Sequence, residues 1–241
     1  MRFRYTLYSL LFSLAVLLGS CSTPAAPELP PLTVSAAVRY LEDQSSLRGT
    51  LIAGTNDSMG GMGGIQFPSA GKLSFVGSGM QATLLPGPGT RYRTELRSPY
   101  PTDLRFTFPR TTTAPGPDAP DPFTLELRMS PPNVQGLPTT LSLEKGITVA
   151  VQDAPLAAGE SILLFFSPTD GPDRQPRKVL IPGPTNGNRF RVPTPALGAL
   201  LPGRYDLYLV KEQRVKRDTL NLRLATLVEF YSRTISVEVT D

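Results

Sequence analysis

The alternation of apolar and polar residues, in short runs that proline and glycine interrupt, limits the fold more than any other feature. Leu104, Phe106 and Phe108 alternate with polar residues, and residues 123–129 repeat the pattern. Such alternation places one set of side chains in a core and the other in water, as in a β-strand. The chain contains 26 Pro and 21 Gly, which are typical of the turns between strands. The pattern therefore predicts an all-β protein.

Two series of such runs follow one another, and each has enough strands for one β-sandwich. The first series comprises residues 34–41, 47–53, 72–76, 81–85, 91–96, 104–108 and 123–129. The second series comprises residues 141–143, 147–151, 161–166, 178–181, 190–192, 204–211, 220–224 and 226–239. We expect two tandem domains, residues 33–133 and 138–241. Two proline-rich stretches, 110–122 and 130–138, compete for the boundary, and we prefer the second.

A proline-glycine turn precedes a tyrosine in both series. In the second series, Leu201 to Tyr205 resembles the entry to a late strand of immunoglobulin-like domains. In those domains the tyrosine hydroxyl bonds to an upstream backbone group. Leu85 to Gly87, followed by Tyr92 after a longer insert, is either a degenerate repeat of this module or a turn of similar composition. The resemblance implies two immunoglobulin-like β-sandwich domains.

The N-terminus has the three parts of an export signal. Arg2 and Arg4 form a positive start, an apolar run extends from Leu7 to Leu18, and small residues precede Cys21. The apolar run is shorter than the roughly 20 residues that a membrane-spanning helix needs. Leu18 to Cys21 resembles the lipobox of bacterial lipoproteins, in which the cysteine becomes the acylated N-terminus. The resemblance implies a lipid attached at Cys21.

The lipid anchor implies a location in the cell envelope. Two or three acyl chains make membrane attachment effectively permanent. By the rule for Gram-negative lipoproteins, Ser22 in place of an aspartate favours the outer membrane, and either face of that membrane is compatible with the sequence. The proline-rich residues that follow favour an extended tether. We therefore expect a signal peptide over residues 1–20 and an acylated cysteine with its tether over residues 21–32.

The absence of histidine excludes several classes of function. The chain has no His and one Cys, which removes zinc sites built on these residues and nucleophile systems that need a histidine base. Loss of Arg2 and Arg4 with the signal lowers the formal net charge from +4 to +2, and no long block of like charge occurs, so we expect no nucleic-acid partner. Residues 211–217, which include Glu212, are interpreted as a solvated hairpin end. We expect no enzyme, no cofactor and no metal.

Three residues are candidates for contact with a partner. Met59 and Met62 lie in a glycine-rich stretch, residues 56–64, that is interpreted either as a mobile binding loop or as a disordered connection. Tyr100, between Pro99 and Pro101, is the best candidate for an exposed aromatic ring. A flat exposed platform around Tyr100 would indicate a glycan ligand.

The segments together resemble two-module envelope lipoproteins of Gram-negative bacteria that have no assigned activity. The resemblance and the composition predict a non-catalytic binding or scaffold lipoprotein whose partner is another envelope protein. An exposed edge strand that pairs with a partner strand fits this role. A surface glycan-binding lipoprotein is the alternative. A carboxylate-dependent hydrolase comes third, because it needs two carboxylates that face one cleft and no spacing in the sequence indicates such a pair.

Overall fold

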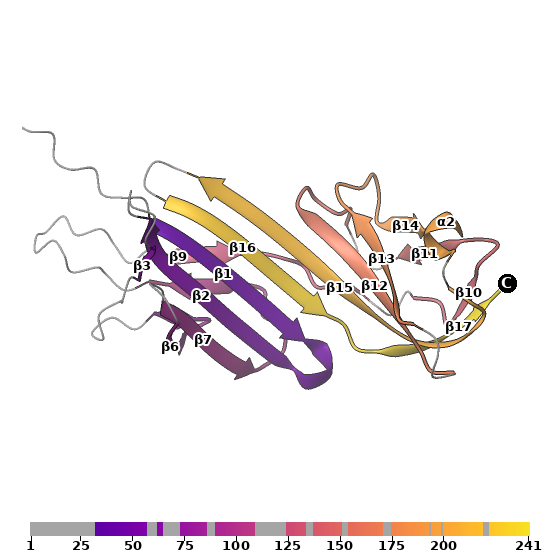
Figure 1. Cartoon of the computed structure of the whole chain (residues 1–241), viewed down its shortest axis with the longest axis horizontal. Coiled ribbons are helices and arrows are strands. Elements are labelled where there is room, and N and C mark those ends of the chain that lie inside the picture. The colour runs from indigo at the N-terminus through magenta and orange to yellow at the C-terminus, as the bar shows by residue number, and fades with distance from the viewer. Residues whose placement is uncertain are drawn as a thin grey trace, which may run out of the picture. The chain divides into compact units, whose positions relative to one another are not determined.

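Strands account for most of the described chain, so the prediction of an all-β protein is confirmed at this level (Figure 1). The structure is a computed structural model that describes residues 32–56, 62–64, 73–85, 90–108, 124–133, 137–150, 154–170, 175–192, 194–198, 200–218 and 222–241. Pro31–Asp241 forms one compact unit. The predicted signal peptide and Cys21 lie outside the described residues. Within the described part, no helix is long and apolar enough to cross a membrane.

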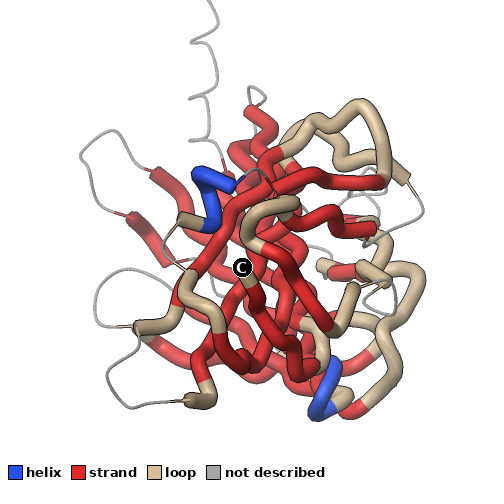
Figure 2. The backbone as a smooth tube through the Cα atoms, turned by 90° about the vertical axis from the view of Figure 1, so that its right-hand side faces the viewer, coloured by secondary structure: helices blue, strands red, loops and turns tan. Residues whose placement is uncertain are grey.

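The strands differ in length: β1, β2, β15 and β16 each have at least ten residues, whereas β4 and β5 have two each. They are β1 (Leu32–Leu41), β2 (Ser46–Asn56), β3 (Met62–Gly64), β4 (Ser74–Phe75), β5 (Ser78–Gly79), β6 (Gln81–Leu84), β7 (Thr90–Arg97), β8 (Leu104–Thr107), β9 (Thr124–Leu127), β10 (Thr140–Ser142), β11 (Ile147–Ala150), β12 (Glu160–Pro168), β13 (Arg177–Pro182), β14 (Arg189–Val192), β15 (Gly203–Asp218), β16 (Leu222–Tyr231) and β17 (Ile235–Thr240). Among the described residues, the short helices are η1 (Glu42–Gln44) and α2 (Thr194–Leu197), drawn in blue in Figure 2.

One large mixed sheet and two small sheets contain these strands. The large sheet has 11 strands, with the main order β10-β17-β15-β16-β1-β2-β7-β6. β12 pairs with β15 and β13, and β3 pairs with β2. β1 runs parallel to β16 and antiparallel to β2, and Figure 1 shows these three strands side by side. The small sheets have the orders β5-β4-β8-β9 and β11-β14.

The large sheet covers two hydrophobic cores. In the first core, the inward residues of β16, β1, β2 and β7 pack against the small sheet that contains β4, β8 and β9. In the second core, the inward residues of β12, β13, β15 and β17 pack with those of β11, β14 and α2. Each core therefore lies between the large sheet and a smaller group of strands, and both bury apolar side chains in it.

The strands β15 and β16 connect the two cores. Tyr205 and Leu207 of β15 lie in the second core, whereas the end of the same strand pairs with β16. β16 contributes Val228 and Phe230 to the first core, because it pairs along its whole length with β1. A segment of the predicted second domain, residues 138–241, thus completes the sheet over the first core.

The sequence predicts one strand over residues 226–239, and this expectation is wrong. β16 ends at Tyr231 and β17 begins at Ile235. The Ser232 hydroxyl accepts a hydrogen bond from the Leu209 amide at 3.0 Å and donates one to the Arg233 carbonyl at 2.9 Å. These bonds hold a break in the strand. The chain can therefore leave its position beside β1 and continue beside the other half of β15.

The interpretation of residues 211–217 as a solvated hairpin end is wrong for Lys211. β15 continues to Asp218, and the Lys211 side chain is only 3 % exposed. Its Nζ lies 3.2 Å from Glu160 Oε1 and donates to the Ser130 carbonyl at 3.2 Å. A sequence pattern shows that Lys211 is charged, but it does not show the acidic partner that makes its burial possible.

The tyrosine contact that the immunoglobulin-like resemblance implies is confirmed. The Tyr205 hydroxyl donates to the Leu201 carbonyl at 2.8 Å and accepts from the Leu201 amide at 3.2 Å. The ring is buried in the second core. The two hydrogen bonds with Leu201 give the hydroxyl partners at the start of β15, as a buried tyrosine hydroxyl requires.

Candidate functional site

The large sheet exposes a row of charged side chains on the face opposite the first core. Residues of β1 and β2 that alternate with core residues point to this outer face. Register aligns Glu229 with Arg39, Arg39 with Arg48, and Arg48 with Glu95 across β16, β1, β2 and β7. Glu212 of β15 lies opposite Glu229 and extends the row. We call these five residues the charged row.

Four of the five charges of this row are paired with one another. Arg39 Nη2 lies 2.7 Å from Glu229 Oε2, and Arg39 Nε donates to the same oxygen at 2.8 Å. Arg48 Nη2 lies 3.2 Å from Glu95 Oε1. Arg39 and Arg48 face each other directly across two strands, which is unfavourable for like charges. The two glutamates paired with these arginines offset this repulsion, and Glu212 pairs with Arg214 of its own strand at 3.0 Å.

A hollow of about 730 Å³ lies beside the charged row. Its floor includes Ala37, Thr50 and Leu227, which are half-buried, and Arg91 and Arg93 of β7 line one side. The two arginines point to the same face because they are two residues apart in a strand. We call this hollow, with its floor and the two arginines, the arginine trough.

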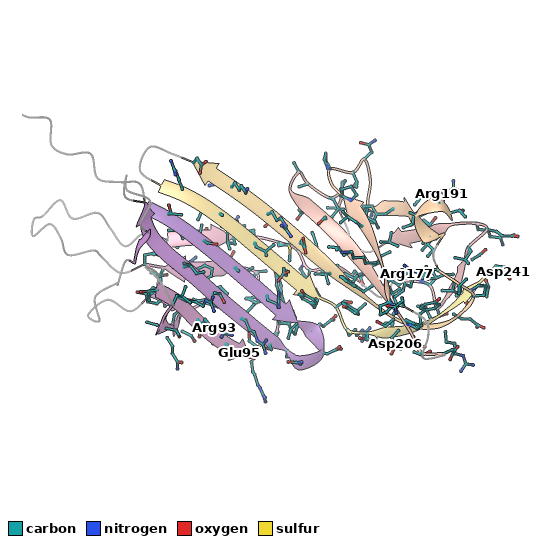
Figure 3. The ribbon with its side chains drawn as sticks, in the orientation of Figure 1. Arg93, Glu95, Arg177, Arg191, Asp206 and Asp241 are labelled. Carbon is teal, nitrogen blue, oxygen red and sulfur yellow. The ribbon has the colours of Figure 1, made fainter. Side chains whose placement is uncertain are left out.

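Arg91 and Arg93 differ from the arginines of the charged row. Neither forms an ion pair with any residue that the structure describes, and Arg93 is exposed. Glu95 is the nearest acid along β7, and Figure 3 shows it close to Arg93 on that strand. Hydrogen bonds from the Ser46 hydroxyl, at 2.8 Å, and from Arg48 lower the pKa of Glu95, and the charge of Arg93 adds to this effect. Since Glu95 is already bonded to Ser46 and Arg48, the trough retains excess positive charge.

The outer face continues over the second core as an aromatic patch. Phe165 of β12 and Tyr208 of β15 are half-buried partners in the register, and their rings stack with centroids 4.9 Å apart at an angle of 4°. Leu180 of β13 is 58 % exposed beside them. Tyr231 of β16 lies under the Arg39 guanidinium, which is 5.2 Å from the ring centroid. We call Leu163, Phe165, Leu180, Tyr208 and Tyr231 the aromatic patch, and the Arg39–Tyr231 contact joins it to the charged row.

Neither a known protein family nor any curated protein matches this sequence.

The Tyr100 ring does not form the exposed platform that the sequence suggests. It packs edge-on against Tyr40 and Phe230, with both centroid distances 5.3 Å, and its hydroxyl donates to the Met129 carbonyl at 2.9 Å. Burial raises the pKa of the Tyr100 hydroxyl far above its ordinary value. The prolines on either side do not show that this segment folds over the first core. A role of Tyr100 in binding stays a prediction.

The other candidates are placed only in part. Met62 begins β3, which pairs with the end of β2, and Met59 lies outside the described residues, as does Cys21. Roles for these three residues stay predictions. Among the described residues, no group of three or more Cys, Asp or Glu gathers where it could hold a metal. On the outer face, Glu95, Glu212 and Glu229 each form an ion pair with an arginine.

The sequence reasoning missed the arginine trough and the aromatic patch. Their residues are the outward members of the alternating runs, whereas the alternation itself identifies only the inward, core positions. Arg91 and Arg93 gave a local signal, since both occupy outward positions of one predicted strand. Their relation to Ala37, Thr50 and Leu227 depends on strand pairing, which no single run specifies.

Proposed function

We propose that this chain is a lipid-anchored protein of the cell envelope and acts as a non-catalytic binding module for a protein partner. The outer face supports this proposal because it combines an aromatic patch with arginines, and tyrosine, phenylalanine and arginine are enriched where proteins bind one another. The observation with most weight is the arginine trough. There Arg91 and Arg93 face a hollow without an acidic partner among the described residues.

The anchor and the domain architecture belong to the same proposal. The match of Leu18 to Cys21 to a lipobox supports acylation of Cys21, and Ser22 supports the outer membrane. The two cores support two sandwich modules, and the Tyr205 contact supports an immunoglobulin-like second module. In this arrangement the tether holds the outer face away from the lipid, where a partner protein has access to it.

Photo-crosslinking in intact cells tests the proposed function. Thr83 of β6 is exposed at the side of the trough, and a photoreactive p-benzoylphenylalanine at this position should form an adduct with a partner protein. Thr124 of β9 is exposed on the small sheet, so the same amino acid there is the matched control. We expect a defined protein adduct from position 83 and none from position 124. No protein adduct from position 83, or the same adducts from both positions, would contradict the proposal.

Glycan binding is the second candidate, and the stacked Phe165 and Tyr208 rings favour it. Sugars pack against exposed aromatic faces, and these two rings are half-buried on an open sheet. If the partner is a glycan, Phe165→Ala should abolish its binding, whereas Arg91→Gln should leave it unchanged. A glycan array probed with the native chain and both variants separates this candidate from the protein-binding proposal.

A further inference from the structure

We propose that the arginine trough binds an extended acidic segment of the partner protein, in which alternate carboxylates pair with Arg91 and Arg93. This inference rests on the proposed function and names the chemistry of the partner. Some arginines of the outer face are paired with glutamates and others are not. Arg39 and Arg48 are paired within the charged row, whereas Arg91 and Arg93 form no ion pair with a described residue.

The spacing of the two arginines matches an extended peptide. Arg91 and Arg93 are alternate residues of β7, so their Cα atoms are about 6.8 Å apart at a strand's usual rise. A peptide in an extended conformation places its own alternate side chains at the same interval. An arginine guanidinium binds a carboxylate through two parallel hydrogen bonds, which favours carboxylates over a diffuse negative surface. Acidic residues at every second position therefore fit this pair.

The floor of the trough favours a peptide over a sugar. Ala37, Thr50 and Leu227 present small or aliphatic side chains, and the residues that line the hollow include no aromatic ring. A sugar ring lacks a stacking surface here, since the aromatic patch lies over the second core. A peptide backbone can lie close to such a floor while its acidic side chains reach the arginines. The hollow of about 730 Å³ is large enough for several residues.

The acids already present do not neutralise the trough. Glu95 accepts a hydrogen bond from Ser46 at 2.8 Å and pairs with Arg48 at 3.2 Å. Glu229 pairs with Arg39 at 2.7 Å. Both carboxylates thus hold the arginines of the charged row and leave Arg91 and Arg93 to a ligand.

Fluorescence anisotropy with labelled peptides tests this inference on the full chain in detergent micelles. The probe is an alternating Thr-Glu peptide, and an alternating Thr-Gln peptide of the same length is the neutral control. We expect the Thr-Glu peptide to bind and R91Q/R93Q to weaken it at least about tenfold, since charge-assisted hydrogen bonds to both carboxylates are lost. R91K/R93K, which keeps the charge without the planar fork, should give an intermediate loss.

The matched control removes two arginines that do not line the trough, Arg105 of β8 and Arg128, which directly follows β9. Arg105 lies 3.1 Å from Glu126, and Arg128 lies 3.7 Å from Asp103. R105Q/R128Q lowers the net charge by the same amount as R91Q/R93Q, and we expect it to change the peptide affinity less than about twofold at the same ionic strength. Circular dichroism of both double variants should show native secondary structure, because none of the four side chains belongs to a hydrophobic core.

Three results would overturn the inference. They are equal binding of the Thr-Gln peptide, unchanged binding to R91Q/R93Q, and binding of polygalacturonate that depends on Arg91 and Arg93 while the acidic peptide does not bind. A protein adduct from position 83 without acidic-peptide binding would overturn this inference and leave the proposed function standing. Peptide binding that requires both arginines, with no adduct in cells, would support the trough's chemistry and contradict the proposed function.

Discussion

Replacement of Lys211 by methionine should destabilise the fold strongly. The side chains of Lys211 and Glu160 are 3 % and 9 % exposed, and their charged atoms lie 3.2 Å apart. Lys211→Met keeps most of the side chain's volume but leaves the Glu160 carboxylate buried without a cation. Breaking a buried ion pair from one side usually costs about 3–5 kcal/mol of stability.

The contacts around the pair place the expected cost near the lower end of that range. Glu160 Oε2 still accepts a hydrogen bond from the Ala157 amide at 2.9 Å, which stabilises part of its charge. The Ser130 carbonyl loses its bond from Lys211 Nζ. We therefore expect a loss of about 3 kcal/mol in the free energy of unfolding at pH 7. Lys211→Met together with Glu160→Gln removes both charges, so it should cost clearly less than the single change.

Urea unfolding followed by far-ultraviolet circular dichroism measures these differences. Lys216→Met is the matched control, because Lys216 is an exposed residue of the same strand and its loss should change stability by less than about 0.5 kcal/mol. A cost of less than about 1 kcal/mol for Lys211→Met would contradict this prediction. So would a loss of stability in the double variant equal to the sum of the losses in Lys211→Met and Glu160→Gln measured singly.

Two further predictions concern the first core and its outer face. Gly49→Ala should lower the free energy of unfolding by about 1–3 kcal/mol, because a Cβ at this position would lie 2.6 Å from Cδ1 of the buried Phe75 ring. Urea unfolding measures this loss. Native-like stability would contradict the prediction, since it would mean that the ring moves away freely. Ser46→Ala should raise the pKa of Glu95 toward its ordinary value, measured by carboxyl NMR titration, because the hydrogen bond that lowers it is lost. The stability that Glu95 contributes is present above its unfolded-state pKa and disappears as the pH falls through the lower folded-state pKa. In Ser46→Ala this loss of stability should therefore occur at a higher pH. An unchanged pKa of Glu95 would contradict the hydrogen bond as the cause.

The sequence predicts features that depend on neighbouring residues. The alternation at Leu104 and Phe106 identifies an inward strand face, and both residues are fully buried. The Tyr205 contact could be expected because its partner, Leu201, is only a turn away. By contrast, β3 and β5 have only three and two residues, too few for an alternating pattern, so they could not be predicted from the sequence.

Features that depend on distant residues could not be predicted in the same way. The parallel register of β16 with β1 joins Leu222 to Leu32, and many strand pairings would bury the same apolar positions equally well. Lys211 has a charge that favours water, and only Glu160 on another strand makes its burial favourable. The arginine trough combines residues of β1, β2, β7 and β16, so it exists only after those strands have paired.

Cell fractionation with protease treatment of intact cells tests most directly the claim that this is an anchored envelope protein. The native chain should be in the membrane fraction, and Cys21→Ala should be released or left as uncleaved precursor. Cleavage by the added protease would place the outer face of the sheet at the cell surface, and protection would place it in the periplasm. Native protein that fractionates as soluble would contradict the account.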